Sequence, residues 1–175
     1  MTEAPPAPRP RRAAVPAAPI SVLLVDDQAV IRQGIRRLLV PEPDIVVVGE
    51  ARDGLQAVAM ATRLDPDVVL MDIGMPNMNG IEATKRLREV APRSRVLILS
   101  AHSDDDYIQA VLAIGAVGYI LKHSSLATLA RAIRRTVKGR TVVSPVVRHR
   151  HSALNPGPSG IGGLPSGRGG RPGSR

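Results

Sequence analysis

Five apolar runs recur along this chain at near-regular intervals, and four of them end on a residue that carries a charge or a hydroxyl group. The four runs are Val22–Val25 before Asp26 and Asp27, Val68–Met71 before Asp72, Val96–Leu99 before Ser100, and Val117–Leu121 before Lys122. The fifth run, Ile45–Val48, ends on no comparable residue. Parallel strands buried on both faces are continuous Val/Ile/Leu runs, and open α/β sheets bind ligands at the carboxyl ends of their strands. The spacing therefore predicts one pocket that gathers three carboxylates, a hydroxyl and an ammonium group.

Helical patterns separate these apolar runs. Five helices are predicted: one after Asp27, one over residues 54–64, one over about residues 81–90, one from Ser103 to Gly115 and one from Leu126 to Gly139. Strands that alternate with helices imply a parallel sheet with right-handed crossovers. The strand that adds nothing to the pocket is best placed at an edge. The predicted fold is therefore an α/β, flavodoxin-like, doubly wound sheet of five parallel strands in the order 2-1-3-4-5, with five helices.

Both ends of the chain differ in composition from this central part. Twelve of the first 19 residues are Pro or Ala, and 12 of the 21 residues from 155 to 175 are Gly or Pro. Such segments bury too little apolar surface to offset the entropy lost on ordering them. We therefore expect a disordered tail over residues 1–19, one domain over residues 21–139, and a basic, disordered tail over residues 140–175.

The net charge of +9 lies mainly in the tails, because residues 1–19 carry +2, residues 20–140 carry +2 and residues 141–175 carry +5. A basic tail can touch nucleic acid, but a solvated tail is the more common case. The absence of Cys excludes disulfides and thiolate chemistry. No apolar stretch approaches the ~20 residues of a membrane helix, and prolines interrupt any export signal. The sequence thus predicts a cytoplasmic protein without a membrane partner.

The predicted pocket has a consistent chemistry. Three carboxylates placed together repel one another and would raise one another's pKa values unless a cation joined them. Mg²⁺ suits a few carboxylates together with water and phosphate. Lys122 offers a second positive charge that can hold an anion, and the Ser100 hydroxyl can donate to the same anion. A carboxylate that faces Mg²⁺ and Lys can attack phosphorus and become an acyl phosphate, with both cations stabilising the transferred group.

At these residues the sequence resembles the receiver domain of two-component response regulators, from about Ser21 to Gly139. The motifs that carry the resemblance are Val25-Asp26-Asp27, Met71-Asp72-Ile73-Gly74-Met75-Pro76-Asn77-Met78-Asn79-Gly80, Leu99-Ser100-Ala101-His102 and Gly118-Tyr119-Ile120-Leu121-Lys122. The stretch around residues 101–106 is most similar to the NarL/FixJ/LuxR-type branch of these CheY-like domains, whose members carry a helix-turn-helix output domain.

The resemblance implies a role for each site residue. Asp72 matches the phosphorylated aspartate, Asp26 and Asp27 the acids that hold Mg²⁺, Gly74 the residue whose backbone carbonyl is a metal ligand, Ser100 the switch hydroxyl, Lys122 the phosphate-binding lysine, and Tyr119 the rotating aromatic residue. The implied partners are a sensor histidine kinase and, after phosphorylation, a second copy that docks on the fourth helix, fifth strand and fifth helix. Phosphorylation is expected to draw Tyr119 inward. Such a domain catalyses its own phosphoryl uptake and loss but turns over no separate substrate.

Two departures from the family pattern bear on function. His123 stands where many receivers have Pro, although His occurs there in the helix-turn-helix branch. After Ser144-Pro145 the sequence shows no helical periodicity, so a DNA-binding domain and specific DNA binding are not expected. One alternative is therefore a truncated or frameshifted DNA-binding transcriptional regulator. Another is a Mg²⁺-dependent hydrolase of the phosphatase type, which would need a general acid two residues after its nucleophile, where this chain has Gly74.

Overall fold

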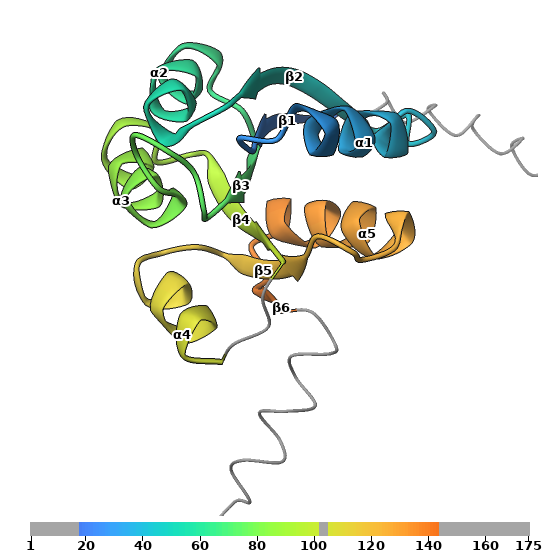
Figure 1. The fold of residues 1–175 in the computed structure, drawn as a ribbon. Helices are drawn as coiled ribbons and strands as arrows, with labels where there is room; N and C mark the ends of the chain where they lie inside the picture. The colour runs from blue at the N-terminus through green and yellow to red at the C-terminus, as the bar shows by residue number, and fades with distance from the viewer. Residues whose placement is uncertain (1–17, 102–104, 144–175) are drawn as a thin grey trace, which may run out of the picture.

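The computed structural model describes residues 18–101 and 105–143. Their sheet has six parallel strands in the order β2-β1-β3-β4-β5-β6 (Figure 1). The strands are β1 (Ile20–Val25), β2 (Ile45–Ala51), β3 (Val68–Asp72), β4 (Arg95–Ser100), β5 (Gly118–Leu121) and β6 (Val142–Val143). The helices are α1 (Ala29–Leu39), α2 (Gly54–Leu64), α3 (Gly80–Val90), α4 (Asp105–Ala113) and α5 (Leu126–Val137). The doubly wound fold and the order of the first five strands are confirmed.

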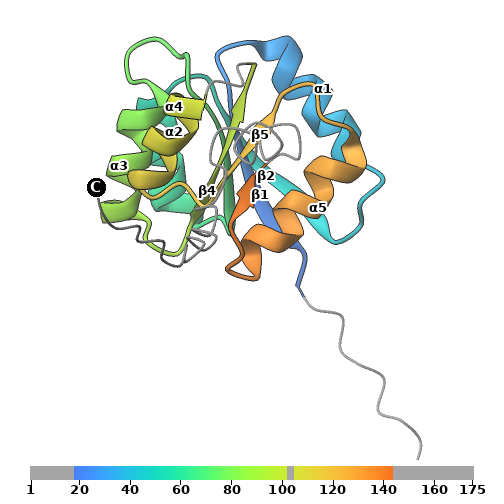
Figure 2. The same cartoon turned by 90° about the horizontal axis from the view of Figure 1, so that it is seen from below.

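Each face of the sheet has its own aliphatic core. Helices α2, α3 and α4 cover one face, and α1 and α5 cover the other (Figure 2). Side chains alternate between the two cores along a strand, so Val69 and Met71 of β3 pack toward α2 and α3 while Val68 and Leu70 pack toward α5. All five residues of β3 are buried, as its apolar run Val68–Met71 predicts, and the buried set includes the terminal acid, Asp72.

The prediction of five strands is wrong by one. Helix α5 ends before Gly139, which adopts φ +73°, and the Arg140 N–H donates to the Arg135 carbonyl. This C-terminal turn reverses the chain and lays β6 parallel to β5, with Val142 buried. A strand of two residues has no periodicity to detect, so the sequence placed residues 140–143 in the tail.

Strand β2 also differs from its prediction, because it continues beyond Val48 to Ala51. The pairing with β1 shifts register there, with Val22 opposite Val47 but Leu23 opposite Gly49. This bulge reverses the alternation of the strand, so Gly49 faces Met60 of α2 and the next residue, Glu50, faces α1.

The N-termini of three helices are capped by side chains that the sequence order places directly before them. Asp53 accepts from the Gln56 N–H, Asn79 from the Glu82 N–H and Ser125 from the Thr128 N–H. The predicted helix start at Ser103 lies outside the described residues, as do residues 1–17 and 144–175 of the predicted tails. Of the helices described, none is long and apolar enough to cross a membrane.

Candidate functional site

Three acids meet at the carboxyl edge of the sheet. Asp26 and Asp27 follow β1, and Asp72 is the last residue of the adjacent strand β3. One carboxylate oxygen from each acid lies within 4.8 Å of the other two. Asp26 and Asp72 are buried, whereas Asp27 is exposed, so the cluster is open to solvent on one side. The structure therefore brings together the three carboxylates that the sequence pattern predicts.

Lys122 lies among these acids. It follows β5, and its Nζ is 2.6 Å from Oδ2 of Asp26 and 3.1 Å from Oδ1 of Asp72. Its side chain is only 15% exposed. Because β4 separates β5 from β3, the lysine must extend across the end of β4 to reach both carboxylates. One ammonium group thus partly compensates two buried negative charges.

The protonation equilibria of the site reflect this crowding. Burial raises the pKa of Asp72 above its ordinary value, and the Asp26 carboxylate adds to the rise, while the hydrogen bond from Lys122 opposes it. Burial lowers the pKa of Lys122, but its hydrogen bonds to Asp26 and Asp72 outweigh this, so the pKa lies above the usual value. A lysine that is held in its protonated form therefore faces an acid whose ionisation costs free energy.

Asp26 is fixed in place by the groups around it. Its Oδ1 accepts a hydrogen bond from the Gln28 N–H at 2.9 Å, and its backbone N–H donates to the Ala51 carbonyl at 3.1 Å. Its backbone carbonyl accepts from Nη1 of Arg32 at 2.6 Å. Oδ1 of Asp26 is thus hydrogen-bonded and Oδ2 lies in the ion pair with Lys122, whereas the exposed carboxylate of Asp27 has more freedom to meet a ligand.

Ser100 and Tyr119 occupy neighbouring strands at this edge. Ser100 ends β4, is 3% exposed, and accepts a hydrogen bond from the Lys122 N–H through its backbone carbonyl. Tyr119 is 0% exposed and packs in the core under α2, α3 and α4. The ring thus occupies an inner position in this structure, and the role of Tyr119 as the rotating aromatic residue remains a prediction.

Gly74 lies in the loop between β3 and α3, and it is exposed. The loop is closed at its base, where the N–H groups of Met75 and Gly80 both donate to the Ile73 carbonyl. Gly80 has to be glycine, since a methyl group there would meet the backbone of Asp72 and Ile73. The role of the Gly74 carbonyl as a metal ligand remains a prediction.

The acid cluster suits a divalent cation. Its donors are all carboxylate oxygens, which hard cations prefer, and its open side leaves room for water or phosphate. The crowding also favours a cation, because added positive charge would relieve the unfavourable ionisation of Asp72. Asp27 and Asp72 are the direct candidates, and Asp26 supports them.

Four residues outside the predicted set of site residues support this site: Arg32, Glu50, Asp53 and Asn77. Arg32 contacts Glu50 as well as the Asp26 carbonyl, and Asp53 accepts a hydrogen bond from Asn77 in the loop after Asp72. Asp53 before Gly54 matches a helix N-cap signature, which the sequence could have indicated. Nothing in the sequence indicates that Arg32 and Glu50 meet.

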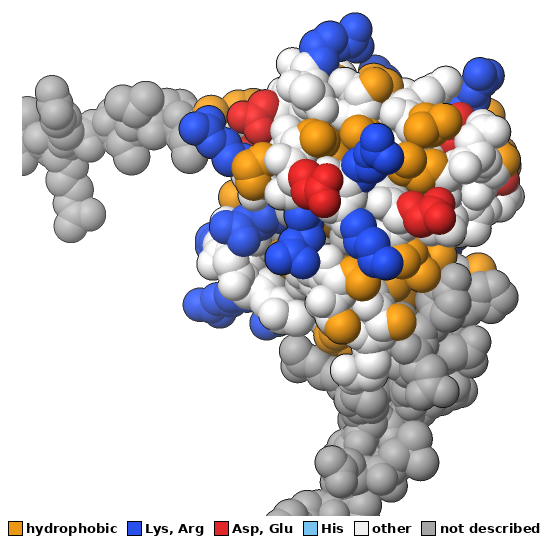
Figure 3. Space-filling view, turned by 90° about the vertical axis from the view of Figure 1, so that its left-hand side faces the viewer, with side chains coloured by type: hydrophobic (Ala, Val, Ile, Leu, Met, Phe, Trp, Pro, Cys, Tyr) orange, Lys and Arg blue, Asp and Glu red, His pale blue; other side chains and the backbone are white. Residues whose placement is uncertain are grey.

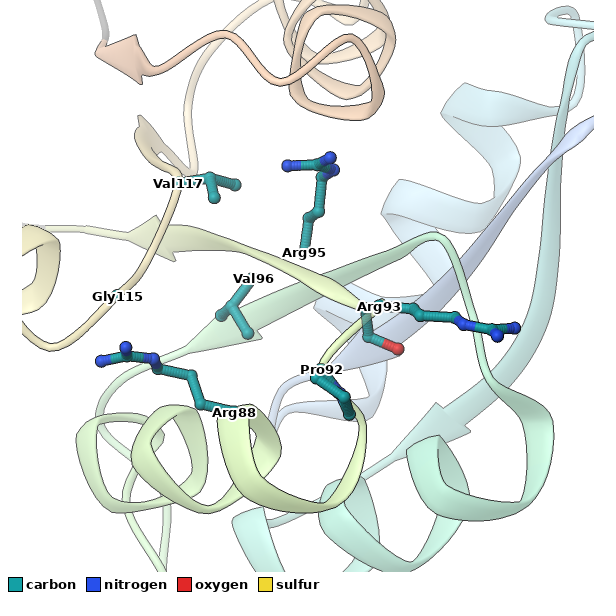
Figure 4. A pocket seen from close by; sticks show the side chains of 8 residues that line it. Arg88, Pro92, Arg93, Arg95, Val96, Gly115 and Val117 are labelled. Atoms are coloured by element: carbon teal, nitrogen blue, oxygen red, sulfur yellow. The ribbon is translucent and has the colours of Figure 1, made fainter.

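Within residues 18–101 and 105–143, the other surface features lack comparable chemistry. Basic and acidic side chains are interspersed on the side of the molecule where α2 and α3 lie (Figure 3). A cavity of about 540 Å³ at the amino end of β4 is lined by Arg88, Arg93 and Arg95, among others. The three guanidinium groups point away from one another (Figure 4), so they do not converge on a single anion.

The fold and the acid cluster define a class of domain: a doubly wound α/β domain with an aspartate pocket at the carboxyl edge of its sheet. The sequence matches the response regulator receiver domain over residues 22–134. The chain therefore belongs to the receiver family of two-component response regulators, which are signalling proteins and not metabolic enzymes.

Known relatives agree with this assignment. The chain is 40% identical over 130 residues to the transcriptional regulatory protein DegU of Brevibacillus brevis, a match that covers 74% of this chain and 55% of DegU. It is 42% identical over 142 residues to LiaR of Bacillus subtilis, covering 78% of this chain and 67% of LiaR. The solved receiver domain of NarL from Mycobacterium tuberculosis is 34% identical with a TM-score of 0.68, covering 71% of this chain and all of that domain.

Proposed function

We propose that this chain accepts a phosphoryl group on Asp72 from a sensor histidine kinase, with Mg²⁺ bound at the acid cluster. The observation that carries the proposal is the meeting of Asp26, Asp27 and Asp72 with Lys122 at one sheet edge. In the transfer, an oxygen of Asp72 forms a bond to phosphorus while the bond from phosphorus to the donor histidine nitrogen breaks, and that nitrogen keeps the electron pair.

The residues of this chain would share the work of that transfer. Asp27 and Asp72 would hold Mg²⁺ directly, and Asp26 would support them. The bound cation would neutralise charge on the transferring group. Lys122 already lies 3.1 Å from Asp72 and would stabilise the phosphoryl oxygens. Ser100, at the end of the adjacent strand, would donate its hydroxyl to the same group. Membership of the receiver family supports a phosphoacceptor role for this chain, and the position of Asp72 within the acid cluster supports its assignment as the acceptor.

Incubation with Mg²⁺ and acetyl phosphate, followed by intact-mass measurement, tests the proposal. The wild-type chain should gain the mass of one phosphoryl group, and Asp72→Asn should gain none. Asp65→Asn is a matched control, because Asp65 is the C-cap of α2 and does not belong to the acid cluster. Asn also tolerates the positive φ of 43° at this position. Uptake by Asp72→Asn equal to that of the control would refute the assignment.

We further propose that the phosphorylated form signals through the surface of α4, β5 and α5, where a second copy would dock. DegU and LiaR are named as transcriptional regulatory proteins, which favours transcription control as the process served. The chain spans 55% and 67% of the length of these two relatives, so a role in transcription is part of the proposal and needs its own test. Sedimentation of the chain with and without beryllofluoride and Mg²⁺ should show a dimer only with both. A monomer in both conditions would contradict this part of the proposal.

A further inference from the structure

The carboxyl end of β2 contacts both loops that carry the acids. The loop after β1 holds Asp26 and Asp27, and the loop after β3 follows Asp72. Residues 50–54 lie beside both loops, although the second apolar run showed no site residue of its own. The contacts on the two sides involve different residues and can be separated by mutation.

On the first side, Arg32 of α1 connects Glu50 to the acid pair. Its Nε lies 3.2 Å from Oε2 of Glu50, and its Nη1 donates to the Asp26 carbonyl at 2.6 Å. The Arg32 side chain is only 17% exposed. The bulge at Val48 turns Glu50 toward α1 and so permits this contact. Glu50 therefore orients a guanidinium group that holds the backbone of Asp26.

On the second side, Asp53 and Gly54 hold the loop after Asp72. Oδ2 of Asp53 accepts from Nδ2 of Asn77 at 3.1 Å, and the Gly54 N–H donates to the Met78 carbonyl at 3.0 Å. Any side chain at position 54 would collide with Met78. Asn77 adopts φ 63°, a left-handed conformation that its side-chain contact with Asp53 helps to fix.

We propose that Glu50–Gly54 positions both acid-bearing loops, acting through Arg32 and Asn77, and thereby sets the affinity of the site for a divalent cation. This inference rests on the proposed Mg²⁺ site. Groups that orient metal ligands without contacting the metal typically lower metal affinity by about 10- to 100-fold when they are removed. Arg32 and Asn77 are positioning residues, because neither belongs to the acid cluster itself.

Mg²⁺ titration by calorimetry, paired with urea unfolding in Mg²⁺-free buffer, tests the inference. Arg32→Ala and Asn77→Gly should each weaken Mg²⁺ binding by about tenfold. Glycine at position 77 keeps the left-handed backbone accessible while removing the contact with Asp53. Glu50→Gln leaves Arg32 without its charged partner and should also weaken Mg²⁺ binding. This variant tests the role of Arg32 in holding the Asp26 loop if Arg32→Ala does not fold.

Two control variants separate positioning from a general loss of stability. Arg36 also pairs with Glu50, at 3.1 Å, but its side chain is 59% exposed. Among the described residues, Glu50 is the one acid with which Arg36 forms an ion pair. Asp65 is the other non-glycine residue with positive φ among those described. Arg36→Ala and Asp65→Gly should bind Mg²⁺ within about twofold of wild type, well below the loss expected for a positioning group.

The possible outcomes are distinguishable. If the wild-type chain does not bind Mg²⁺, the proposed function itself fails. If the wild type binds but Arg32→Ala and Asn77→Gly bind as well as their controls, the inference is overturned. It is equally overturned if affinity follows the free energy of unfolding across all variants, controls included. Selective loss of affinity in the variants at positions 32, 50 and 77 would support it.

Discussion

Lys122 contacts Asp72 across an intervening strand: Nζ lies 3.1 Å from Oδ1, although β4 separates β5 from β3. The same ammonium group lies 2.6 Å from Asp26. A phosphoryl group added to Asp72 would change how this single buried cation is shared between the two acids. Because Lys122 directly follows β5, we expect this local change of charge to act on the strand that carries Tyr119.

The first prediction concerns the stabilising effect of this cation. Lys122→Met should lower the free energy of unfolding by about 2–3 kcal/mol in Mg²⁺-free buffer, since it leaves two buried carboxylates without compensation. Added Mg²⁺ should restore part of the loss. Urea unfolding with and without Mg²⁺ measures both effects. Lys85→Met, at an exposed position of α3, should change stability by less than about 0.5 kcal/mol. Equal stability of the two variants would contradict the ion-pair argument.

The second prediction concerns the charge on Asp72. Because its pKa is raised in the folded protein, the native state holds this proton more tightly than the unfolded chain. Ionisation of Asp72 therefore costs stability as the pH rises. Asp72→Asn should raise the free energy of unfolding at pH 7 without Mg²⁺ by about 0.5–1 kcal/mol.

Two further measurements check this interpretation of Asp72. The advantage of the Asn variant should shrink as the pH falls through the raised folded-state pKa toward 3.8, because the wild-type acid then takes up its proton in the folded state, and it should vanish below 3.8, where the carboxyl group is neutral in both states. Mg²⁺ should stabilise the wild type more than the variant. A variant less stable than wild type at pH 7 without Mg²⁺ would show that burial is not the dominant cost.

The sequence predicted the arrangement of the acids because that arrangement depends on strand order alone. Each apolar run ends on its own chemical group, and parallel strands deliver their carboxyl ends to one edge. The positions of Asp26, Asp27, Asp72 and Lys122 then follow without knowledge of any side-chain conformation. Tyr119 could not be placed in this way, since whether its ring is inside or outside depends on packing.

The supporting contacts could not be predicted, because they depend on long-range geometry. The contact between Arg32 and Glu50 requires a bulge at Val48, and a shift of one residue reverses which face a side chain occupies. Arg134 is similar, since its helical pattern predicts a solvated face. In the structure it donates from Nε to Asp44 at 2.7 Å and also pairs with Glu42, in the turn before β2.

The third prediction uses the cap of α2. The pKa of Asp53 is lowered, chiefly by the hydrogen bond from the Gln56 N–H and also by Asn77. Its negative charge therefore stabilises the fold above the unfolded pKa, and this contribution is lost as the pH falls through the folded pKa, below 3.8. Asp53→Ala should cost about 1 kcal/mol at pH 7. Asp53→Asn, which can still cap the helix, should cost less.

The pH dependence of these variants identifies the contribution of charge. The difference in unfolding free energy between the wild type and Asp53→Asn should disappear at pH values where the wild-type carboxyl is neutral in both states. Ser125→Ala removes the cap of α5 without a titrating group, so its cost should not depend on this ionisation. A constant gap between wild type and Asp53→Asn down to pH 2 would contradict a role for the charge.

The last prediction concerns the close packing of Gly80 behind Asp72. A methyl group at position 80 would overlap the carbonyl oxygen of Asp72 and lie 2.9 Å from the Cα of Ile73. Gly80→Ala should therefore cost about 1–3 kcal/mol of stability, as overpacking does elsewhere, and should also weaken Mg²⁺ binding because it displaces the backbone of Asp72. Gly34→Ala in α1 has no neighbouring atom within 4 Å of the new methyl group and should instead stabilise by about 0.5–1 kcal/mol. Thermal unfolding and Mg²⁺ titration of both variants test this contrast. A Gly80→Ala protein with wild-type stability and Mg²⁺ affinity would mean that the loop after Asp72 can relax, and that its tight closure does not hold the acid in place.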